Sequence, residues 1–314
     1  MPGQLLEAVP NFSEGVDDET IAALAQAFEQ AGACLADVHR DVDHHRSVFT
    51  VFGDAPTLRS ACRAAVAVAI ERIDLSLHEG VHPRVGACDV LPIVPMSGHH
   101  PRGGTMDDAC ALAREIAADI GDLYAVPTLL YGAAVERGSD RSSEVTFAGA
   151  LRRGGLGALQ ARLQSQTLVA HAGPTDIHPT AGVVLVGARP VLVAFNVVLD
   201  SDDLELARAV ATDIRERDGG LPGVRSLGLT LASRGLVQVS TNVERWAEVD
   251  PRAVLDAIAA CANERGGRVL EAELVGLAPG RALDRLRAGA IPIRAAGNAT
   301  IEEHLARCAR VQPR

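Results

Sequence analysis

The order of strands and helices constrains the fold of this 314-residue chain more than any other feature of its sequence. In the first part of the chain, short apolar runs between polar turns predict strands, and apolar residues at helical spacing predict helices. The strands fall at residues 5–9, 34–38, 47–52, 88–94 and 125–131, and the helices run from a cap at Asp17 or Asp18 to Gly32, over 55–72 and over 105–120. The order strand, helix, strand, strand, helix, strand is that of a ferredoxin-like, split βαβ unit.

The second part of the chain shows the same kind of pattern. Residues 136–172 predict a connector, and residues 183–186 and 191–198 predict a hairpin. Further strands are predicted at 224–231, 236–240 and 269–275, and helices at 201–217, 250–264 and 300–308. We therefore expect an α+β fold of two ferredoxin-like subdomains with facing sheets and outer helices. The subdomains are expected to span residues 1–172, connector included, and residues 173–314.

Composition narrows the classes of function. Hydrophobic residues make up 47% of the chain and charged residues 22%, which is enough apolar material for a well-buried core. A net charge of −10 and an aromatic content of 3% argue against a nucleic-acid partner. The N-terminus lacks the features of a secretory signal, and the longest apolar stretch, residues 64–70, is too short to span a bilayer. We expect a cytoplasmic protein without a membrane partner.

The six cysteines are scattered along the chain without a C-x-x-C pair. Most of them stand in apolar contexts, so they are expected to be reduced core residues, as is usual in cytosolic proteins. They are Cys34, Cys62, Cys88, Cys110, Cys261 and Cys308.

Residues 78–90, HEGVHPRVGACDV, form the stretch with the greatest density of polar side chains. Pro83 fixes its own φ and disfavours helical geometry at His82, so the imidazole is expected on a stiff, extended backbone. Because imidazole changes charge near neutral pH, His82 is a candidate proton donor and acceptor. Arg84 is suited to binding a carboxylate through two hydrogen bonds. The alternative is a structural role, in which His82 caps a strand and Arg84 pairs with a nearby acid.

Four stretches, in order along the chain, together resemble one known family. They are VPNFSEG at residues 9–15, the His82 loop, VGAR at 186–189 with AFN at 194–196, and LVGL at 274–277. The family is glutamate formimidoyltransferase, which also forms the N-terminal domain of formimidoyltransferase-cyclodeaminase. The resemblance extends from about Leu5 to Leu283.

The resemblance implies transfer of a formimidoyl group between N-formimidoyl-L-glutamate and tetrahydrofolate, a co-substrate, in histidine degradation and without a metal. It also implies a folate-binding tunnel between two ferredoxin-like subdomains, a homodimer, and a separate cyclodeaminase that takes the product. The proton-handling histidine of the family falls on His82. Its folate-contacting segment, at the start of the second subdomain, falls on Gly173, Pro174, Thr175, Asp176, Ile177, His178, Pro179, Thr180, Ala181 and Gly182.

The residues suit this reaction. Attack of an amine on an amidine carbon gives a tetrahedral intermediate, and the departing glutamate amine must be protonated. A positioned imidazole can accept one proton and return another, which contributes roughly 10²–10⁴ in rate. Both substrates carry carboxylates, so arginines are candidate partners. The candidate substrate-binding residues are Asn11, Asp43, His45, Arg46, Arg84, Asp89, Asn196 and Asn242. For the segment 173–182, the alternative is an ordinary linker.

Several positions depart from the residues usual in the family. His45 stands where bacterial members commonly have asparagine, Ala133 where glutamate is usual, and Val198 where asparagine is frequent. Asp176 to His178 and Ala181 also differ from the usual folate segment. Another one-carbon donor or acceptor is therefore an alternative.

Two other classes of function compete with a transferase. One is a metal-dependent amidine or amide hydrolase, because nitrogen and oxygen ligands are plentiful near the His82 loop. Its candidate ligands are Asp41, Asp43, His44, His45, His78, His82 and Asp89. Adjacent histidines on an extended backbone point to opposite faces, and no H-E-x-x-H motif is present, so hydrogen-bonding roles are favoured. The other class is a catalytically silent folate-binding protein.

Overall fold

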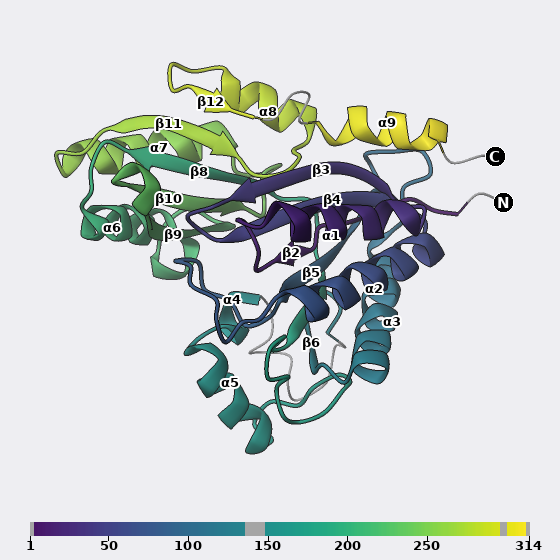
Figure 1. Cartoon of the computed structure of the whole chain (residues 1–314). Coiled ribbons are helices and arrows are strands. Elements are labelled where there is room, and N and C mark those ends of the chain that lie inside the picture. The colour runs from purple at the N-terminus through teal and green to yellow at the C-terminus, as the bar shows by residue number, and fades with distance from the viewer. Residues whose placement is uncertain (1–2, 136–147, 296–299, 312–314) are drawn as a thin grey trace. The chain divides into compact units, whose positions relative to one another are not determined.

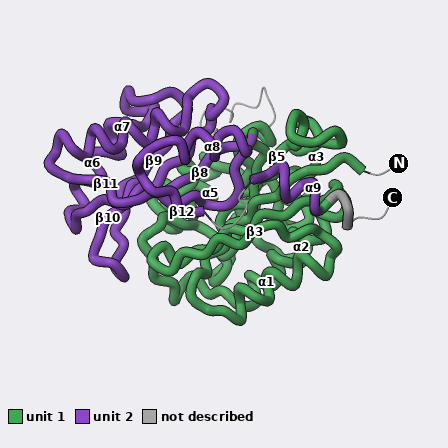
Figure 2. Tube along the Cα trace, turned by 90° about the horizontal axis from the view of Figure 1, so that it is seen from above, with its two compact units in different colours: residues 1–190, 308–314 green, residues 191–307 purple. Residues whose placement is uncertain are grey.

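The computed structural model of the chain describes residues 3–135, 148–295 and 300–311. It is an α+β structure with two sheets (Figure 1). The chain divides into two compact units, which Figure 2 colours separately. Unit 1 is Met1–Pro190 with Cys308–Arg314, and unit 2 is Val191–Arg307. In sequence, unit 2 is therefore an insertion near the C-terminal end of unit 1.

Unit 1 is built on a seven-stranded sheet. β1 (Leu6–Ala8) and β2 (Asn11–Phe12) follow one another in one line between β4 (Arg46–Gly53) and β5 (Cys88–Pro95), with antiparallel pairing on both sides. β3 (Cys34–Asp41) pairs antiparallel with β4. On the other side of β5, β7 (Val184–Ala188) and then β6 (Thr128–Gly132) continue the sheet in parallel.

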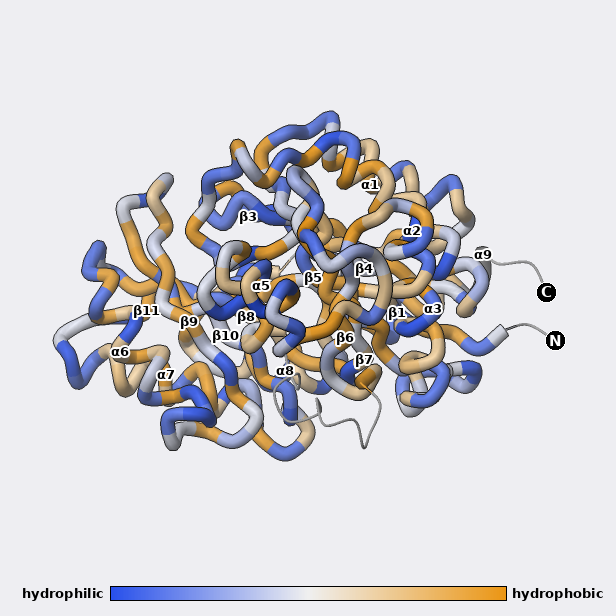
Figure 3. The backbone as a smooth tube through the Cα atoms, turned by 90° about the horizontal axis from the view of Figure 1, so that it is seen from below, coloured by the Kyte–Doolittle hydropathy of each residue, from blue (hydrophilic) through white to orange (hydrophobic). Residues whose placement is uncertain are grey.

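Helices cover both faces of this sheet. α1 (Asp18–Gln30), α2 (Ala55–Arg72) and α3 (Met106–Tyr124) share an apolar core with alternate strand residues such as Phe49 and Val51. α4 (Ala148–Leu151) and α5 (Gly155–Gln164) contribute Leu151 and Leu159 to a second cluster with Val90 and Leu185. The apolar runs of the inner strands appear as orange segments in Figure 3. The sheet is therefore buried on both sides.

Side-chain caps explain where the three long helices of unit 1 begin. The Asp17 carboxylate accepts hydrogen bonds from the backbone N–H groups of Glu19 and Thr20, and α1 follows it. Thr105 and Asp108 form a capping box at the start of α3. Ala125 adopts the left-handed conformation after α3, so β6 starts at Thr128 and not at residue 125 as predicted.

Unit 2 contains a five-stranded sheet in the order β12-β11-β8-β10-β9. Its strands are β8 (Val193–Leu199), β9 (Val224–Leu231), β10 (Leu236–Val243), β11 (Val269–Leu274) and β12 (Ile293–Arg294). Its helices are α6 (Leu204–Ile214), α7 (Pro251–Glu264), α8 (Gly280–Arg287) and most of α9 (Ile301–Val311). β9, β10, β8 and β11 pair antiparallel, and β12 runs parallel to β11. None of the helices that the structure describes is long and apolar enough to cross a bilayer.

The predicted hairpin at residues 183–198 is wrong. β7 pairs in parallel with β5 and β6 in the sheet of unit 1, whereas β8 lies in the sheet of unit 2. Each strand is apolar enough to be buried in a different core, and Pro190 lacks the backbone donor that would extend a ladder between them. The units accordingly divide between Pro190 and Val191, whereas the sequence placed the division between residues 172 and 173.

Cys34 and Cys308 form a disulfide, with Cα atoms 5.7 Å apart and 274 residues between them in sequence. The prediction that all six cysteines are reduced is wrong for this pair, because the fold brings the first residue of β3 against α9. Cys62, Cys88 and Cys110 are free and buried, as predicted, and Cys261 is free and half-buried. Burial raises the pKa of the Cys62 thiol to about 12, so this thiol is unreactive.

Glu7 places a carboxyl group in the middle of the first sheet. It lies on β1 between Phe52 of β4 and Val94 of β5, and 4% of its surface is exposed. Burial raises the pKa of this carboxyl to about 7, and the positive charge of Arg189 opposes the rise in part. Because Leu6 and Ala8 belong to the core shared with α1–α3, alternation along β1 points Glu7 to the opposite face.

Candidate active site

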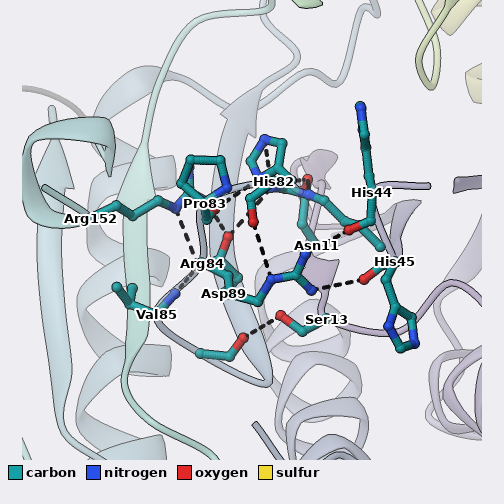
Figure 4. Close-up of polar contacts among 12 residues, drawn as sticks. Asn11, Ser13, His44, His45, His82, Pro83, Arg84, Val85, Asp89 and Arg152 are labelled. Carbon is teal, nitrogen blue, oxygen red and sulfur yellow. Dashed lines mark hydrogen bonds and ion pairs between the residues drawn. The ribbon is translucent and has the colours of Figure 1, made fainter. Parts of the chain in front are cut away.

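The elements around β2 and the start of β5 bring most of the predicted site residues together in unit 1. The loop between α2 and β5 carries His82, and the turn between β3 and β4 leads into Arg46 at the start of β4. Asn11 opens β2, where it pairs with Val48 of β4 and Val90 of β5. Figure 4 shows the side chains of Asn11, Arg84 and Asp89 gathered beside His82. Segments far apart in the sequence therefore form one polar cluster.

His82 is half-buried and contacts both the backbone and Arg46. Its Nδ1 lies 2.8 Å from the carbonyl oxygen of Pro83, and Nη1 of Arg46 lies 2.6 Å from Nδ1 and 3.1 Å from Nε2. In the tautomer protonated on Nδ1, the ring donates to the carbonyl oxygen of Pro83, and Nε2 is the nitrogen left to accept from Arg46. Burial lowers the pKa of His82 well below its usual value, and the charges of Arg46 and Arg152 lower it further. The imidazole is therefore neutral at pH 7.

Arg46 joins His82 to two other side chains. Its Nε and Nη2 donate to Oδ1 of Asn11 at 3.1 and 2.5 Å, and its Nη1 lies 3.5 Å from Oδ2 of Asp89. Asn11 is held in turn, because its Nδ2 donates to the carbonyl oxygen of Val9 at 2.7 Å. Burial lowers the pKa of Arg46 to about 9, and the charge of Arg152 acts in the same direction. A guanidinium in this position favours the arrival of an anion.

Asp89 is 1% exposed and is bound by an arginine that the sequence did not single out. Its Oδ1 accepts from the N–H of Val85 at 2.9 Å and from Nε of Arg152 at 3.2 Å, while Nη2 of Arg152 donates to Oδ2. Arg152 follows α4, in the stretch predicted to be an irregular connector. An arginine beside a weak helical pattern carries no signal that distinguishes it, so sequence reasoning could not have found it.

Arg84 donates hydrogen bonds to backbone carbonyl oxygens of the two loops at the site. Its Nε donates to the carbonyl oxygen of His82 at 3.2 Å, and its Nη2 donates to that of His44 at 2.6 Å. Its Nη1 donates to the carbonyl oxygen of His45 at 3.0 Å and to Nε2 of His78 at 2.6 Å. These bonds fasten the His82 loop to the turn between β3 and β4. All three nitrogens of Arg84 are engaged in these bonds, and its predicted binding of a substrate carboxylate stays a prediction.

His45 and His78 stack on one another beside this cluster. Their ring centroids are 4.0 Å apart, with 28° between the ring planes. Nε2 of His45 lies 3.1 Å from Oε1 of Glu14, and its Nδ1 lies 2.8 Å from the carbonyl oxygen of Glu79. His45 has a φ of 47°, in the left-handed region that asparagine enters more readily. Burial and the charge of Arg84 lower the pKa of His78 to about 4, so that ring is neutral.

The predicted folate segment, residues 173–182, lies beside the His82 loop within unit 1. The carbonyl oxygen of Ala181 accepts from the N–H of Ala87 at 2.9 Å, and a bridge joins Gly182 to Gly86. Gly182 has a φ of +67°, and a Cβ there would collide with the carbonyl oxygen of Val85, so glycine is required for this close approach. The segment therefore adjoins the loop of His82 instead of linking two subdomains.

The remainder of this segment is anchored to α5 and open to solvent. Oδ1 of Asp176 accepts from the side-chain amides of Gln160 and Gln164 at 3.0 and 3.1 Å. The N–H of Ile177 donates to Oε1 of Gln160 at 2.7 Å. Residues 173–176 are exposed. The departure at Asp176 thus has a local structural reason, since its carboxylate binds α5, whereas the bond of Ile177 comes from its backbone and does not depend on the side chain.

The other predicted residues lie elsewhere. Asn196 of β8 and Asn242 of β10 belong to unit 2, where they share one face of the sheet; Asn196 is buried and Asn242 is exposed. Asp43 lies in the turn before His44. Ala133 follows β6 and donates its N–H to the carbonyl oxygen of Ala188 at 2.9 Å. Asp43, Asn196 and Asn242 stay predicted site residues, whereas Ala133 was noted only as a departure from the family.

The ligands of the competing metal site are divided among separate contacts. Nδ1 of His44 lies 3.2 Å from Oδ2 of Asp41, while His45 pairs with Glu14 and Asp89 with Arg152. In the part of the chain that the structure describes, no group of three or more His, Cys, Asp or Glu side chains is arranged to hold a metal ion. The cluster is instead suited to moving protons and binding anions.

Comparison with known proteins identifies the family to which the chain belongs. The sequence model of the formiminotransferase domain, N-terminal subdomain, matches residues 5–189, and that of the formiminotransferase domain matches residues 194–309. The glutamate formimidoyltransferase of Streptococcus pyogenes serotype M1 is 35% identical over 281 residues, which are 89% of this chain and 91% of the relative. That of Thermoplasma acidophilum is 33% identical over 280 residues, 89% of each chain. The formimidoyltransferase-cyclodeaminase of Sus scrofa is 35% identical over 287 residues, 89% of this chain and 51% of the relative. With two matches that together span nearly all of its length, the chain belongs to the formiminotransferase family.

Proposed function

We propose that this chain is a glutamate formimidoyltransferase, which transfers a formimidoyl group between N-formimidoyl-L-glutamate and tetrahydrofolate. Two relatives with that name match it over 89% of its length. The observation that carries the proposal is a neutral imidazole, that of His82, in contact with the guanidinium of Arg46 and on a loop that pairs with the segment 173–182. Tetrahydrofolate is a co-substrate in this proposal, and the reaction uses no resident metal.

In the proposed mechanism, Nε2 of His82 acts first as a base and then as an acid. The acceptor amine of tetrahydrofolate attacks the amidine carbon, and His82 takes the proton that this amine loses. A tetrahedral carbon results, bound to both amines. The bond from this carbon to the glutamate nitrogen then breaks as His82 returns the proton to that nitrogen, releasing glutamate and formimidoyl-tetrahydrofolate. Such a relay contributes roughly 10²–10⁴ in rate. The lowered pKa of His82 keeps the ring neutral at the start, as a base must be, and makes its protonated form a ready proton donor in the second step.

Arg46 controls when this base is available. While Nη1 of Arg46 lies beside the ring, 3.1 Å from Nε2, it competes with the substrate for the lone pair of that nitrogen. A substrate carboxylate is a stronger acceptor than a neutral imidazole, so the guanidinium is expected to turn toward it when the substrate binds. Binding of N-formimidoyl-L-glutamate thereby frees Nε2 to accept a proton.

We also propose that each unit is ferredoxin-like. The order β3-β4-β1/β2-β5 in unit 1 and the order β11-β8-β10-β9 in unit 2 support this, since each has its helices after the first and third strands. From the family we further propose a homodimer, a place in histidine degradation upstream of a separate cyclodeaminase, and a cytoplasmic location. In that compartment the disulfide of Cys34 and Cys308 would form under oxidising conditions.

The test is formimidoyl transfer by the purified chain and by its His82→Ala variant. The variant is expected to lose roughly 10²–10⁴ in kcat while its affinity for tetrahydrofolate changes little, because the ring handles protons. His171→Ala, at an exposed position, is the control. Equal turnover in His82→Ala and the parent refutes the role of His82. Binding of tetrahydrofolate without turnover in the parent would instead indicate a folate-binding protein.

A further inference from the structure

One charged side chain at the site has no part in the reaction proposed above. Arg152 stands next to Leu151, which is fully buried in the apolar cluster with Val90 and Leu185. The N–H of Arg152 donates to the carbonyl oxygen of Ala148 at 3.2 Å, so its backbone continues the turn of α4. The neighbouring Leu151 therefore anchors Arg152 against the sheet beneath the site.

The guanidinium of Arg152 binds the carboxylate of Asp89 through two of its nitrogens, Nε and Nη2. Nε lies 3.2 Å from Oδ1, and Nη2 donates to Oδ2, so both carboxylate oxygens are engaged in parallel. Oδ1 also accepts the N–H of Val85, which ties the pair to the backbone that follows the His82 loop. Arg46 reaches the same carboxylate by a single nitrogen at 3.5 Å, beyond hydrogen-bond distance. Figure 4 shows Arg152 and the His44–His45 turn on opposite sides of Asp89.

Among the residues that the structure describes, two guanidiniums meet one carboxylate here. Those of Arg46 and Arg152 share the carboxylate of Asp89, whose side chain is 2% exposed. If Asp89 belonged to Arg46 alone, the two would form a closed neutral pair, and neither His82 nor a substrate anion would attract the guanidinium. With Arg152 on Asp89, Arg46 keeps its donors for Asn11 and His82.

We propose that Arg152 is a positioning residue of the site: by holding Asp89 edge-on, it leaves Arg46 free to contact His82 and then to bind a carboxylate of the substrate. This inference rests on the proposed function only for the identity of that substrate. The contacts from Arg152 through Asp89 and Arg46 to His82 exist in the protein without it. Arg152 itself touches no reacting atom in this scheme.

The arrangement also sets the protonation of His82. The groups that face the ring are Arg46 from β4, His44 from the turn before it, Arg152 after α4 and the carbonyl oxygen of Pro83. Burial lowers the pKa of the ring most, the charges of Arg46, Arg152 and His44 lower it further, and the hydrogen bond to the Pro83 carbonyl raises it. Loss of the Arg152 charge therefore moves the pKa of His82 upward. As the pH is lowered, the ring is then protonated, and its reactive neutral form lost, at a higher pH than in the parent.

The experiment compares Arg152→Gln and Arg152→Lys with the parent, and uses Arg153→Gln, at the exposed neighbouring position, as the matched control. Far-UV circular dichroism and a thermal melt establish folding. Arg152→Gln is expected to lower kcat/KM roughly 10²-fold, with a raised KM for N-formimidoyl-L-glutamate, because Arg46 is displaced from its place. The acid limb of its pH profile should move upward by about half a pH unit or more. Arg152→Lys should return the acid limb to its position in the parent, because lysine keeps the positive charge. It should restore turnover only in part, because lysine cannot bind both carboxylate oxygens of Asp89 as a guanidinium does.

Two readouts separate this inference from the proposed function. Titration of the His82 ring protons by NMR, identified by their loss in His82→Gln, follows the ring without any substrate. If the parent transfers no formimidoyl group, the proposed function fails, yet an upward-shifted ring titration in Arg152→Gln still supports the positioning role. If the ring titration and the acid limb are the same in Arg152→Gln, Arg153→Gln and the parent, the inference is overturned, whatever the loss of activity.

Discussion

Replacement of Glu7 by glutamine is expected to stabilise the protein at alkaline pH and much less at mildly acidic pH. The carboxyl has a pKa of about 7 in the folded chain against its usual value of 4.5. Because the folded state holds the proton more tightly than the unfolded state, the free energy of unfolding falls as pH rises from 4.5 through 7 and stays low above that. At about 1.4 kcal/mol per pKa unit, the ionised group costs about 3 kcal/mol at pH 8 and about 1 kcal/mol at pH 5.

Urea denaturation of the parent and Glu7→Gln, followed by circular dichroism at both pH values, measures this difference. The gain from the substitution should be about 2 kcal/mol larger at pH 8 than at pH 5. Glu29→Gln, at an exposed position of α1, is the matched control and should show no such dependence. An equal gain at the two pH values, or a loss at pH 8, would refute desolvation of Glu7 as the cause.

Three further outcomes follow from contacts in unit 1. Asn11→Ala removes the oxygen that accepts from Nε and Nη2 of Arg46, and should lower kcat/KM roughly tenfold; a value within about twofold of the parent would contradict this. The acid limb of kcat/KM in the parent should lie below pH 6.5, because the pKa of His82 is lowered and its neutral form reacts; a limb above neutrality argues against His82 as the base. Thiol titration of the unfolded, unreduced chain should find four free thiols, and six after reduction, because Cys34 and Cys308 are joined; six without reduction would show the pair open.

Local signals in the sequence predicted most of the elements well. α2 begins at Ala55 and ends at Arg72, as predicted, because the Asp54 side chain caps its start. α7 follows a cap at Asp250 and has Pro251 in its first turn, where the missing N–H is harmless. The two-residue strands β2 and β12 and the helix α8 were not predicted. Two residues carry no periodicity, and α8 starts at a glycine and contains three arginines and an aspartate.

Long-range partners were less predictable from the sequence. His82, Arg46, Asn11 and Asp89 were identified by type and spacing, and the structure brings them together. Arg152 was missed because its importance depends on Asp89, which lies 63 residues away. The hairpin at 183–198 failed for a related reason, since two adjacent apolar strands do not reveal that they enter different sheets. The Cys34–Cys308 pair has no local signal either.

The bond between Cys34 and Cys308 closes most of the polypeptide into a covalent ring, and all of unit 2 lies within that ring. A single cut by a protease anywhere between these two cysteines therefore leaves one molecule of unchanged mass apart from an added water. Its two pieces would separate on a denaturing gel only after the disulfide has been reduced. New chain ends introduced in a turn of unit 2 would likewise leave the pieces of unit 1 tethered.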